Sequence, residues 1–374
     1  MNRRPSQSRT GFDSFSPQHT AHFKAAQPGG EFFEPKPRAS LGSRLLLALL
    51  LMTLIALAVN LAVNQFVRVA RVTVPIRRMD PAFEGYTLLQ ISDLKGATYG
   101  SNQALIRFAL QNEDFDAVVF TGDMVSSRGN AQPLYALIEM LRELKPDTPI
   151  YMIPGDKDPL PASMSYATGG SPFAPWVLGA KQRGGQLLSA PVQIERDGHT
   201  LWLTTSALLS LDMDTMQAQF ERQYLDALAD GDENAIELTT YNLQWLTETR
   251  NARAKMTDAD VYIALTHVPP ADEELESAYP GSLRERVHLV LCGHYQGGLI
   301  RLPFAGALFI PSQNLPLYGL LPGADTYFGL TRKGRTYLYV SPGLGGNDGL
   351  YPLPFFRLFN PPTVSLISLT TSSL

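Results

Sequence analysis

Hydrophobic residues are most concentrated in one early run, the 19 residues 45–63, which carry no charge and only two polar side chains, Thr53 and Asn60. As a helix, a run of this length rises about 28 Å, nearly the thickness of a bilayer's hydrocarbon core. The run therefore predicts a transmembrane anchor within residues 44–67. The small-x-small sequence at 56–58 also fits signal-peptide cleavage, although the stretch before it is much longer than a usual n-region. A buried helix of a soluble protein is the third interpretation.

The flanks of this predicted anchor do not decide its orientation. Basic residues precede it at positions 36, 38 and 44 and follow it at positions 68, 71, 77 and 78. The positive-inside rule therefore favours neither side. Because single N-terminal anchors commonly pass a long following domain across the membrane, we expect a single-pass protein of the cell membrane with its globular part outside the cytoplasm.

Beyond the anchor, short apolar runs alternate with amphipathic ones. Strand-like runs at 87–93, 117–123 and 149–156 are separated by helical periodicity at 101–111 and 132–144. Short apolar strands joined by helices are typical of βαβ units with buried parallel strands. The pattern predicts an α/β fold.

The next block has a different pattern. Two strand-like runs, 186–194 and 199–205, flank an Asp-Gly pair at 197–198, which indicates a β-hairpin. Residues 210–256 then show helical periodicity, and residues 211–260 contain 11 Asp and Glu against 4 Lys and Arg. This predicts a solvated helical insertion, which is also a candidate surface for a protein partner.

These patterns divide the chain into a disordered polar tail at 1–43, the anchor at 44–67, a linker at 68–85 and one domain at 86–374. The net charge of −4 provides no general basic surface, so no nucleic acid is expected as a partner. Cys292 is the single cysteine, which excludes an intrachain disulfide.

Five strand-like runs share one chemical feature, because each ends in an acidic residue or a histidine. The five terminal residues are Asp93, Asp123, Asp156, His267 and His294. Parallel α/β sheets bind ligands beyond the carboxyl ends of their strands, so these side chains are expected to converge. Carboxylate and imidazole together suit Mn, Fe or Zn, and paired ions of this kind support phosphoryl transfer.

The short motifs around these residues are more specific than their spacing. They read Ile-Ser-Asp-Leu at 91–94, Phe-Thr-Gly-Asp at 120–123, Pro-Gly-Asp-Lys-Asp at 154–158, Leu-Thr-His-Val-Pro at 265–269 and Cys-Gly-His-Tyr-Gln-Gly-Gly at 292–298. In this order they resemble the five motifs of calcineurin-like metallophosphoesterases. Further matches at 300–303, 339–345, 356–357 and 361–362 resemble the membrane-associated bacterial branch. The resemblance implies a four-layer α/β-β/α sandwich and metal-dependent hydrolysis of a phosphoric ester.

The resemblance also implies a role for each position. The family binds a first metal through the Asp of motif one and a His two residues later, and this chain has Asp93 and Lys95 there. Asp123 matches the Asp that bridges both metals. In motif three, Asp156 stands where the family has Asn, a ligand of the second metal, and Lys157 stands where the family has His.

The last two motifs complete the second metal position. His267 matches motif four and His294 the first His of motif five, whereas Gln296 replaces the second His, a ligand of the first metal. The resemblance therefore implies one intact site for a single divalent ion, formed by Asp123, Asp156, His267 and His294, with Asp93 remaining from the first position.

Lys95 suggests how the altered first position is compensated. A protonated lysine cannot bind a metal, but its charge can offset neighbouring carboxylates, so we expect Lys95 to replace the first ion. Lys95 and Lys157 would then stabilise an anionic substrate, either a phosphorylated small molecule or an envelope phosphate ester. The lost ligands equally fit an inactive descendant that binds an anionic ligand or a protein partner. His199 and His288 are expected to lie outside the site.

Overall fold

The structure, a computed structural model, describes residues 40–126, 128–163, 171–276, 283–302, 305–308, 310, 320–323, 327–346 and 357–372. Nearly all of the expected disordered tail at 1–43 lies outside the described residues. The chain divides into two compact units, Met1–Thr53 and Leu54–Leu374. Both sheets belong to the second unit.

The expected apolar helix is α1 (Leu41–Val63). Its length and composition are sufficient to cross a membrane, and it is the single helix of this kind in the described part of the chain. Its leucines are largely exposed, as lipid-facing side chains would be, whereas Asn60 is buried. The boundary between the two units falls inside this helix, at Leu54.

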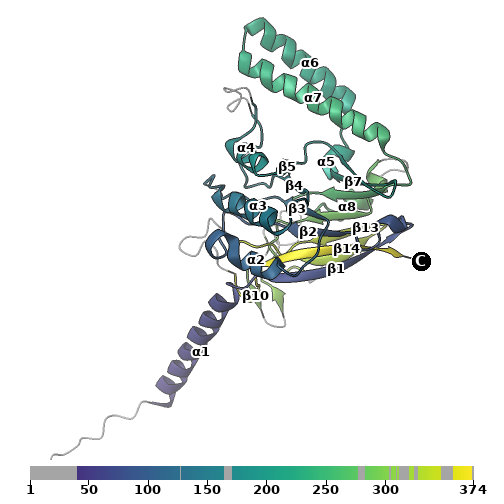
Figure 1. The fold of residues 1–374 in the computed structure, drawn as a ribbon. Helices are drawn as coiled ribbons and strands as arrows, with labels where there is room; N and C mark the ends of the chain where they lie inside the picture. Colours follow the sequence, from purple (N-terminus) through teal and green to yellow (C-terminus); the bar gives the residue numbers. More distant parts are fainter. Residues whose placement is uncertain are drawn as a thin grey trace, which may run out of the picture. The chain divides into compact units, whose positions relative to one another are not determined.

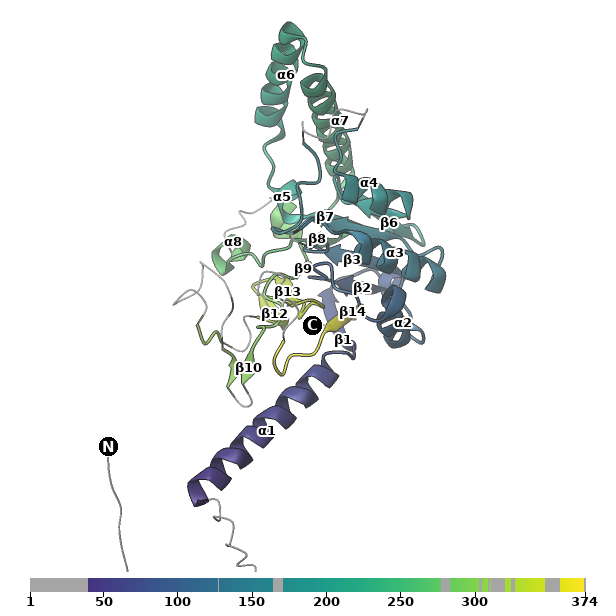
Figure 2. The same cartoon turned by 90° about the vertical axis from the view of Figure 1, so that its left-hand side faces the viewer.

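Two six-stranded sheets form the centre of the second unit (Figures 1 and 2). In sheet order, the first contains β1 (Arg68–Arg77), β14 (Thr363–Ser372), β2 (Thr87–Ile91), β3 (Ala117–Thr121), β4 (Ile150–Ile153) and β5 (Gly185–Leu187). The second contains β12 (Gly329–Lys333), β13 (Thr336–Val340), β9 (Leu289–Cys292), β8 (Val261–Leu265), β7 (His199–Thr205) and β6 (Val192–Arg196). Strands β2 to β5 are mutually parallel, as are β7, β8, β9 and β13. A separate two-stranded sheet pairs β10 (Arg301–Leu302) with β11 (Gly306–Ala307).

Neighbouring residues on the buried strands face different hydrophobic cores, because side chains alternate along a strand. Leu88 and Val119 lie in the core between the two sheets, together with Ile263 of β8. Leu89 and Phe120 lie in the core between the first sheet and its helices. Those helices are α2 (Ala104–Leu110), α3 (Gln132–Leu144) and α4 (Pro175–Gln182).

The outer face of the second sheet has its own core. Trp202 and Tyr262 pack there with Leu209 of α5 (Ser206–Leu209), and Leu275 of α8 (Asp272–Glu276) lies against the same cluster. The expectation of a four-layer α/β-β/α sandwich is therefore confirmed. Short 3-10 helices, η1 (Pro81–Phe83), η2 (Ser101–Gln103) and η4 (Leu283–Arg286), lie in the connections.

The expected helical insertion consists of α6 (Met213–Asp230) and α7 (Glu233–Lys255), which lie side by side in both views (Figures 1 and 2). Asp212 and Asp232 cap their N-termini by accepting backbone N–H hydrogen bonds. Gly231 ends α6 in the left-handed conformation that allows the sharp reversal. Phe220 and Leu246 pack between the two helices.

Two sequence-based boundaries differ from the structure. Residues 68–85 were expected as a linker, but β1 pairs with β14 along its whole length and η1 follows. Val74 and Ile76 face the core between the sheets, and Pro75 is tolerated because β1 is an edge strand. The run 186–194 was expected as one strand, but it contributes to two strands, β5 and β6, in different sheets.

The hairpin at the end of this run is confirmed. β6 and β7 pair antiparallel with Arg196 opposite His199. The two turn residues, Asp197 and Gly198, both have positive φ, at 52° and 82°. This is the backbone geometry that favours Asp-Gly in a two-residue hairpin turn.

Candidate metal centre

The carboxyl ends of five strands meet at one end of the two sheets. Asp93, Asp123 and Asp156 follow β2, β3 and β4 of the first sheet, and His267 and His294 follow β8 and β9 of the second. The ligand atoms of Asp93, Asp123 and His267 lie within 4.8 Å of one another, and so do those of Asp156, His267 and His294. The sheets thus bring together all five residues expected from their strand-end positions.

The backbone around this centre is held in an uncommon conformation. Asp93, Lys95, Asp123, His294 and Gln296 all have φ between 50° and 69°, in the left-handed region. A non-glycine residue there carries a conformational cost, and such residues cluster at functional sites. The strand-end turns therefore direct these side chains inward at a cost that the surrounding contacts must offset.

Close backbone approach explains two glycines of the motifs. A Cβ at Gly155 would lie 2.2 Å from both the backbone N and Oδ1 of Asp123. A Cβ at Gly293 would lie 1.8 Å from Oγ of Ser92 and 2.7 Å from Oδ2 of Asp93. Only glycine allows these loops to pass so close to the two aspartates.

His267 occupies the middle of the second metal position. Its Nε2 lies 3.0 Å from Oδ1 of Asp156 and 3.4 Å from Oδ2 of Asp123. Its Nδ1 lies 2.8 Å from the carbonyl oxygen of Thr121. Because a carbonyl can only accept, Nδ1 carries a proton and donates it, which aims Nε2 at the carboxylates. Nδ1 of His294 lies 3.3 Å from the same Oδ1 of Asp156 and 3.3 Å from Nε2 of His267.

This donor set fits a divalent cation of the Mn, Fe or Zn class. Oδ2 of Asp123 is buried, has no hydrogen-bond partner of standard geometry, and lies 3.1 Å from Nζ of Lys95 and 3.4 Å from Nε2 of His267. Burial disfavours the charged forms of both Asp123 and His267. The attraction between these two groups, and that between His267 and Asp156, outweighs the effect of burial. These attractions lower the pKa of Asp123 and raise that of His267 to about 11. Without an ion, the carboxylates therefore favour a protonated His267, and a bound ion would displace the proton on Nε2 and supply the positive charge instead.

The two other ionisable groups follow the same electrostatics. Hydrogen bonding from His267 holds the pKa of Asp156 below its usual range. Burial and the neighbouring His267 lower the pKa of His294, so its imidazole is more readily neutral and able to donate a lone pair. A neutral imidazole is the form that binds a metal.

Lys95 lies at the first metal position. Its Nζ is 3.1 Å from Oδ2 of Asp123 and 4.0 Å from Oδ1 of Asp93, and all three side chains are buried. Asp93 also accepts hydrogen bonds from Oγ of Ser92 at 2.6 Å and the backbone N of His294 at 3.1 Å. Nε2 of Gln296 lies 3.5 Å from Asp93 Oδ1. An ammonium group is thus placed beside the two carboxylates that the first ion would share.

Lys157 has a different environment from Lys95. Its Nζ lies 3.0 Å from Oδ2 of Asp156, and its side chain is 55% exposed. Its backbone N donates to Oδ1 of Asp123 at 2.9 Å. The Lys157 ammonium therefore lies at the open side of the metal-ligand cluster, where an anionic group from solvent can reach it.

Arg357 is a residue whose role sequence reasoning did not identify. It is 1% exposed, and its guanidinium donates to the carbonyls of Gln296, Pro342 and Gly345 at 3.0, 2.8 and 2.6 Å. The backbone N of Gly345 in turn donates to the carbonyl of Asp93 at 2.6 Å. Arg357 thereby connects the loops on both sides of Asp93. The available signal was an Arg in an otherwise apolar tail motif.

The two other histidines of the described residues, His199 and His288, lie outside the metal centre, as expected. Nδ1 of His288 accepts a hydrogen bond from the backbone N of Tyr262 at 3.1 Å, which identifies it as a structural side chain. His199 lies at the start of β7, with Nδ1 2.8 Å from Oδ2 of Asp80.

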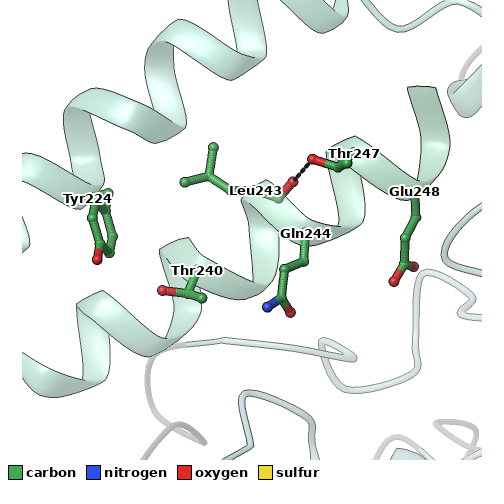
Figure 3. A pocket seen from close by; sticks show the side chains of 6 residues that line it. All are labelled: Tyr224, Thr240, Leu243, Gln244, Thr247 and Glu248. Carbon is green, nitrogen blue, oxygen red and sulfur yellow. Dashed lines mark hydrogen bonds between the residues drawn. The ribbon is translucent and has the colours of Figure 1, made fainter. Parts of the chain in front are cut away.

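A cavity of about 400 Å³ on the helical insertion is separate from the metal centre (Figure 3). Tyr224 contributes from α6 and the other lining residues from α7, where Oγ1 of Thr247 donates to the carbonyl of Leu243. Glu248 is its one acidic lining residue, and none of the lining residues is a histidine or cysteine. This cavity therefore offers no set of metal ligands.

Comparison with known proteins finds several that are similar to this chain. The chain is 26% identical over 268 residues to the uncharacterized metallophosphoesterase YkuE of Bacillus subtilis strain 168, covering 70% of this chain and 73% of the relative. Phosphopantetheinyl hydrolase PptH from Mycobacterium tuberculosis has 11% identity and a TM-score of 0.35, with 75% of this chain and 98% of that chain covered. TT1561 of Thermus thermophilus has 11% identity and a TM-score of 0.34, with 70% and 90% covered.

A match to a family model shows the family of this chain. Residues 86–296, more than half of the chain, match the model of the calcineurin-like phosphoesterase family. The matched range includes all five strand-end residues of the metal centre. The low TM-scores of the solved structures add nothing to this match. The chain belongs to the calcineurin-like phosphoesterase family.

Proposed function

We propose that this chain is a membrane-anchored phosphoesterase that works with one divalent ion, held by Asp123, Asp156, His267 and His294. The observation that carries the proposal is the convergence of Asp156, His267 and His294 within 4.8 Å, beside the buried carboxylate of Asp123. Family membership supports phosphoester hydrolysis in general. One ion rather than two is proposed because Lys95 is placed between Asp93 and Asp123.

The chemistry divides between the ion and the protein's own cations. A bound Mn, Fe or Zn ion would polarise a phosphoryl oxygen and increase the acidity of a water molecule. Thr121 holds His267 in the tautomer whose Nε2 faces the ligand cluster. Lys157 is exposed enough to contact a phosphate oxygen, and Lys95 supplies a fixed positive charge within the centre. These roles assign anion stabilisation to the two lysines.

The strand directions support a substrate at the membrane surface. β14 runs antiparallel to β2 and parallel to β1, so β1 begins at the end of the sheet where β2 reaches the metal centre. β1 begins at Arg68, shortly after α1 ends at Val63. The chain thus leaves the apolar helix at the same end of the sheet as the metal centre. We propose an envelope phosphate ester as the substrate, with the domain outside the cytoplasm.

A second candidate function rests on the lysine that supports the one-ion centre. If the charge of Lys95 alone compensates Asp93 and Asp123, the centre requires no metal ion. The chain would then bind an anionic ligand without hydrolysing it. The buried ion pair of Lys95 with Asp123, and Gln296 beside Asp93, are the specific observations in favour of this candidate. In it, the same crevice and the same lysines act as a binding site.

Metal content and hydrolysis together separate the two candidates. The full-length chain, purified in detergent, is expected to hold one equivalent of divalent metal and to hydrolyse phosphomonoesters or phosphodiesters. His267→Ala should weaken metal binding by at least about 100-fold, because changes in residues that only orient ligands already cost about 10–100-fold. Elemental analysis and a colorimetric assay with added Mn, Fe or Zn measure both quantities.

The matched control is His199→Ala, which removes an exposed histidine outside the centre and should leave metal content and hydrolysis unchanged. Absence of stoichiometric metal from the unmodified chain would contradict the proposal. Activity that emerges only in the triple variant Lys95→His, Lys157→His and Gln296→His would instead support the anion-binding descendant.

A further inference from the structure

A cavity of about 910 Å³ opens at the end of the sandwich opposite the metal centre. Its lining includes Ile76 and Ser372 at the ends of β1 and β14, and Val261, His288 and Tyr337 at or just before the starts of β8, β9 and β13. The metal ligands follow the other ends of β8 and β9, and none of them lines this cavity. It is therefore a separate space, of a volume that suits a small organic ligand.

Five arginines line this cavity: Arg77, Arg78, Arg286, Arg332 and Arg335. Arg286 Nε lies 2.8 Å from Asp258 and Arg335 Nη1 lies 3.2 Å from Glu285, so each ion pair engages one of three guanidinium nitrogens. Arg332 donates through Nε to a backbone carbonyl, which leaves its two terminal nitrogens available. Within the described residues, Arg77 and Arg78 have no acidic partner.

The acidic residues of the lining are already engaged by protein groups. Asp258 and Glu285 form the two ion pairs with arginine. Asp80 accepts from the backbone N of Ala82 and lies 2.8 Å from Nδ1 of His199. Asp260 accepts from Trp202 Nε1 and from the backbone N of Thr257, at 3.0 and 2.8 Å. Hydrogen bonds do not remove the charges of Asp80 and Asp260, so the lining holds five arginines against four carboxylates. Within the described residues, Arg77, Arg78 and Arg332 form no ion pair with an acidic side chain.

The local geometry also favours a ligand site over an ordinary solvated surface. Arg78 has a φ of 57°, an uncommon conformation for a residue with a long side chain. The Arg332 guanidinium lies over the ring of Tyr337, with its carbon 5.6 Å from the ring centroid, which restricts its orientation. Burial, with a smaller contribution from the charge of Arg335, lowers the pKa of His288 to about 4, so its imidazole adds no positive charge to the cavity wall at neutral pH.

We propose that this cavity binds a small anion with several negative charges, held by Arg77, Arg78 and Arg332. The planar guanidinium group presents paired N–H donors that match the oxygens of a phosphate or a carboxylate. Several guanidiniums around one cavity favour a ligand with more than one such group. The binding is independent of the metal centre at the other end of the sheets.

Titration of the full-length chain in detergent tests this proposal. Tripolyphosphate and citrate serve as probes of the phosphate and carboxylate forms of the same chemistry, at physiological salt and with a chelator present. The chain carries Lys157→Gln, which removes the exposed cation of the metal centre. Calorimetry should detect one binding site, and Arg77→Gln with Arg332→Gln should weaken it by about tenfold or more.

The matched control replaces two exposed arginines outside the cavity, Arg71→Gln with Arg250→Gln, and should leave the affinity unchanged. Thermal unfolding checks that every variant is folded. Failure of both anions to bind at millimolar concentration would overturn the proposal, as would equal weakening in the control pair. Binding that occurs in the unmodified chain but disappears in Lys157→Gln would place the anion at the metal centre and overturn it as well.

Discussion

The ion pair of Lys95 with Asp123 is the residue-scale feature that distinguishes this centre from a two-ion site. Asp93 and Asp123 are fully buried, and Nζ of Lys95 lies within 4.0 Å of both, on a centre that also includes the imidazole of His267. Removing one partner of a buried pair leaves an uncompensated charge, which costs more than the pair itself contributes. Lys95 therefore stabilises the folded chain as well as shaping the site.

We predict that Lys95→Gln lowers the free energy of unfolding by about 3–5 kcal/mol at pH 7 without metal. Asp93→Asn in the same chain should recover part of this loss, because it removes one of the two repelling carboxylates. Urea unfolding of the full-length chain in detergent measures both values. Lys157→Gln is the matched control, since its exposed pair with Asp156 should contribute no more than about 1 kcal/mol. A Lys95→Gln chain as stable as the unmodified one would contradict the prediction.

His288 provides a residue-scale prediction of pH dependence. Burial and Arg335 lower its pKa from 6.5 to about 4. Between pH 7 and pH 5 the imidazole gains a proton in the unfolded chain but not in the folded one, so acid favours unfolding. The contribution of His288 to this loss at pH 5 is about 2 kcal/mol. His288→Asn, which keeps an acceptor for the backbone N of Tyr262, should therefore lose about 2 kcal/mol less between pH 7 and pH 5.

Urea unfolding at the two pH values measures this difference directly. Equal acid sensitivity in His288→Asn and the unmodified chain would show that another group is responsible. The substitution can also change the free energy of unfolding at pH 7. This effect cancels when the loss between pH 7 and pH 5 is measured within each chain and only the two losses are compared.

At the scale of elements, two strands that are far apart in the sequence form one edge of the first sheet. β1 and β14 pair in parallel over ten residue pairs, although almost 300 residues separate them in the chain.

Asn60, a polar interruption of the apolar run, donates to the carbonyl of Arg357 at 2.7 Å and accepts from the backbone N of Phe359 at 2.9 Å. Both contacts lie within the second unit and tie the end of α1 to the loop that carries Arg357.

Arg357 connects the loop that Asn60 contacts to the loops beside Asp93, through the carbonyls of Gln296 and Gly345. We predict that Arg357→Lys weakens metal binding by about 10–100-fold, because one ammonium cannot hold the carbonyls of Gln296, Pro342 and Gly345 together. It should also reduce stability by about 1–3 kcal/mol for each carbonyl left unpaired. Calorimetric metal titration well below the unfolding temperature separates the two effects.

The matched control for Arg357 is Arg142→Lys. Like Arg357, Arg142 donates to several backbone carbonyls, those of Pro146, Thr148 and Gly184, but it lies next to α3 and away from the metal ligands. It should lose stability without losing metal affinity. Equal metal affinity in Arg357→Lys and the unmodified chain would limit Arg357 to a structural role.

At the scale of the whole molecule, the proposed membrane anchor leads to a prediction of which side of the membrane holds the domain. Cys292 is buried in β9, so the chain offers a low background for cysteine labelling. We predict that Asp230→Cys, on exposed α6, reacts with a membrane-impermeant maleimide in intact cells, whereas Ser40→Cys, just before α1, reacts only after the membrane is opened. The reciprocal pattern would place the domain in the cytoplasm. Loss of residue 40 from the mature chain by mass spectrometry would indicate a cleaved signal peptide.

Local information in the sequence was sufficient for the chemical character of the site and for most elements. Burial of both faces makes the parallel strands continuous apolar runs, so β2, β3, β4, β8 and β9 are visible without a structure. A ligand at the end of such a run follows from the direction of the strand. The type I′ turn at Asp197 and Gly198 is local in the same way.

Contacts between distant residues required the tertiary structure. β1 buries only Val74 and Ile76 of its ten residues, and its pairing with β14 identifies it as a strand of the first sheet. Residues 186–194 are divided between two sheets because β5 pairs with β4 in the first sheet and β6 pairs with β7 in the second. Tertiary packing also determines the 3.1 Å contact of Lys95 with Asp123 and the hydrogen bonds of Arg357 to backbone carbonyls. The sequence alone thus determined which groups the centre contains, because strand pattern and motifs are local. Only the fold decided how those groups compensate one another, because charge and hydrogen-bond satisfaction depend on distances across both sheets.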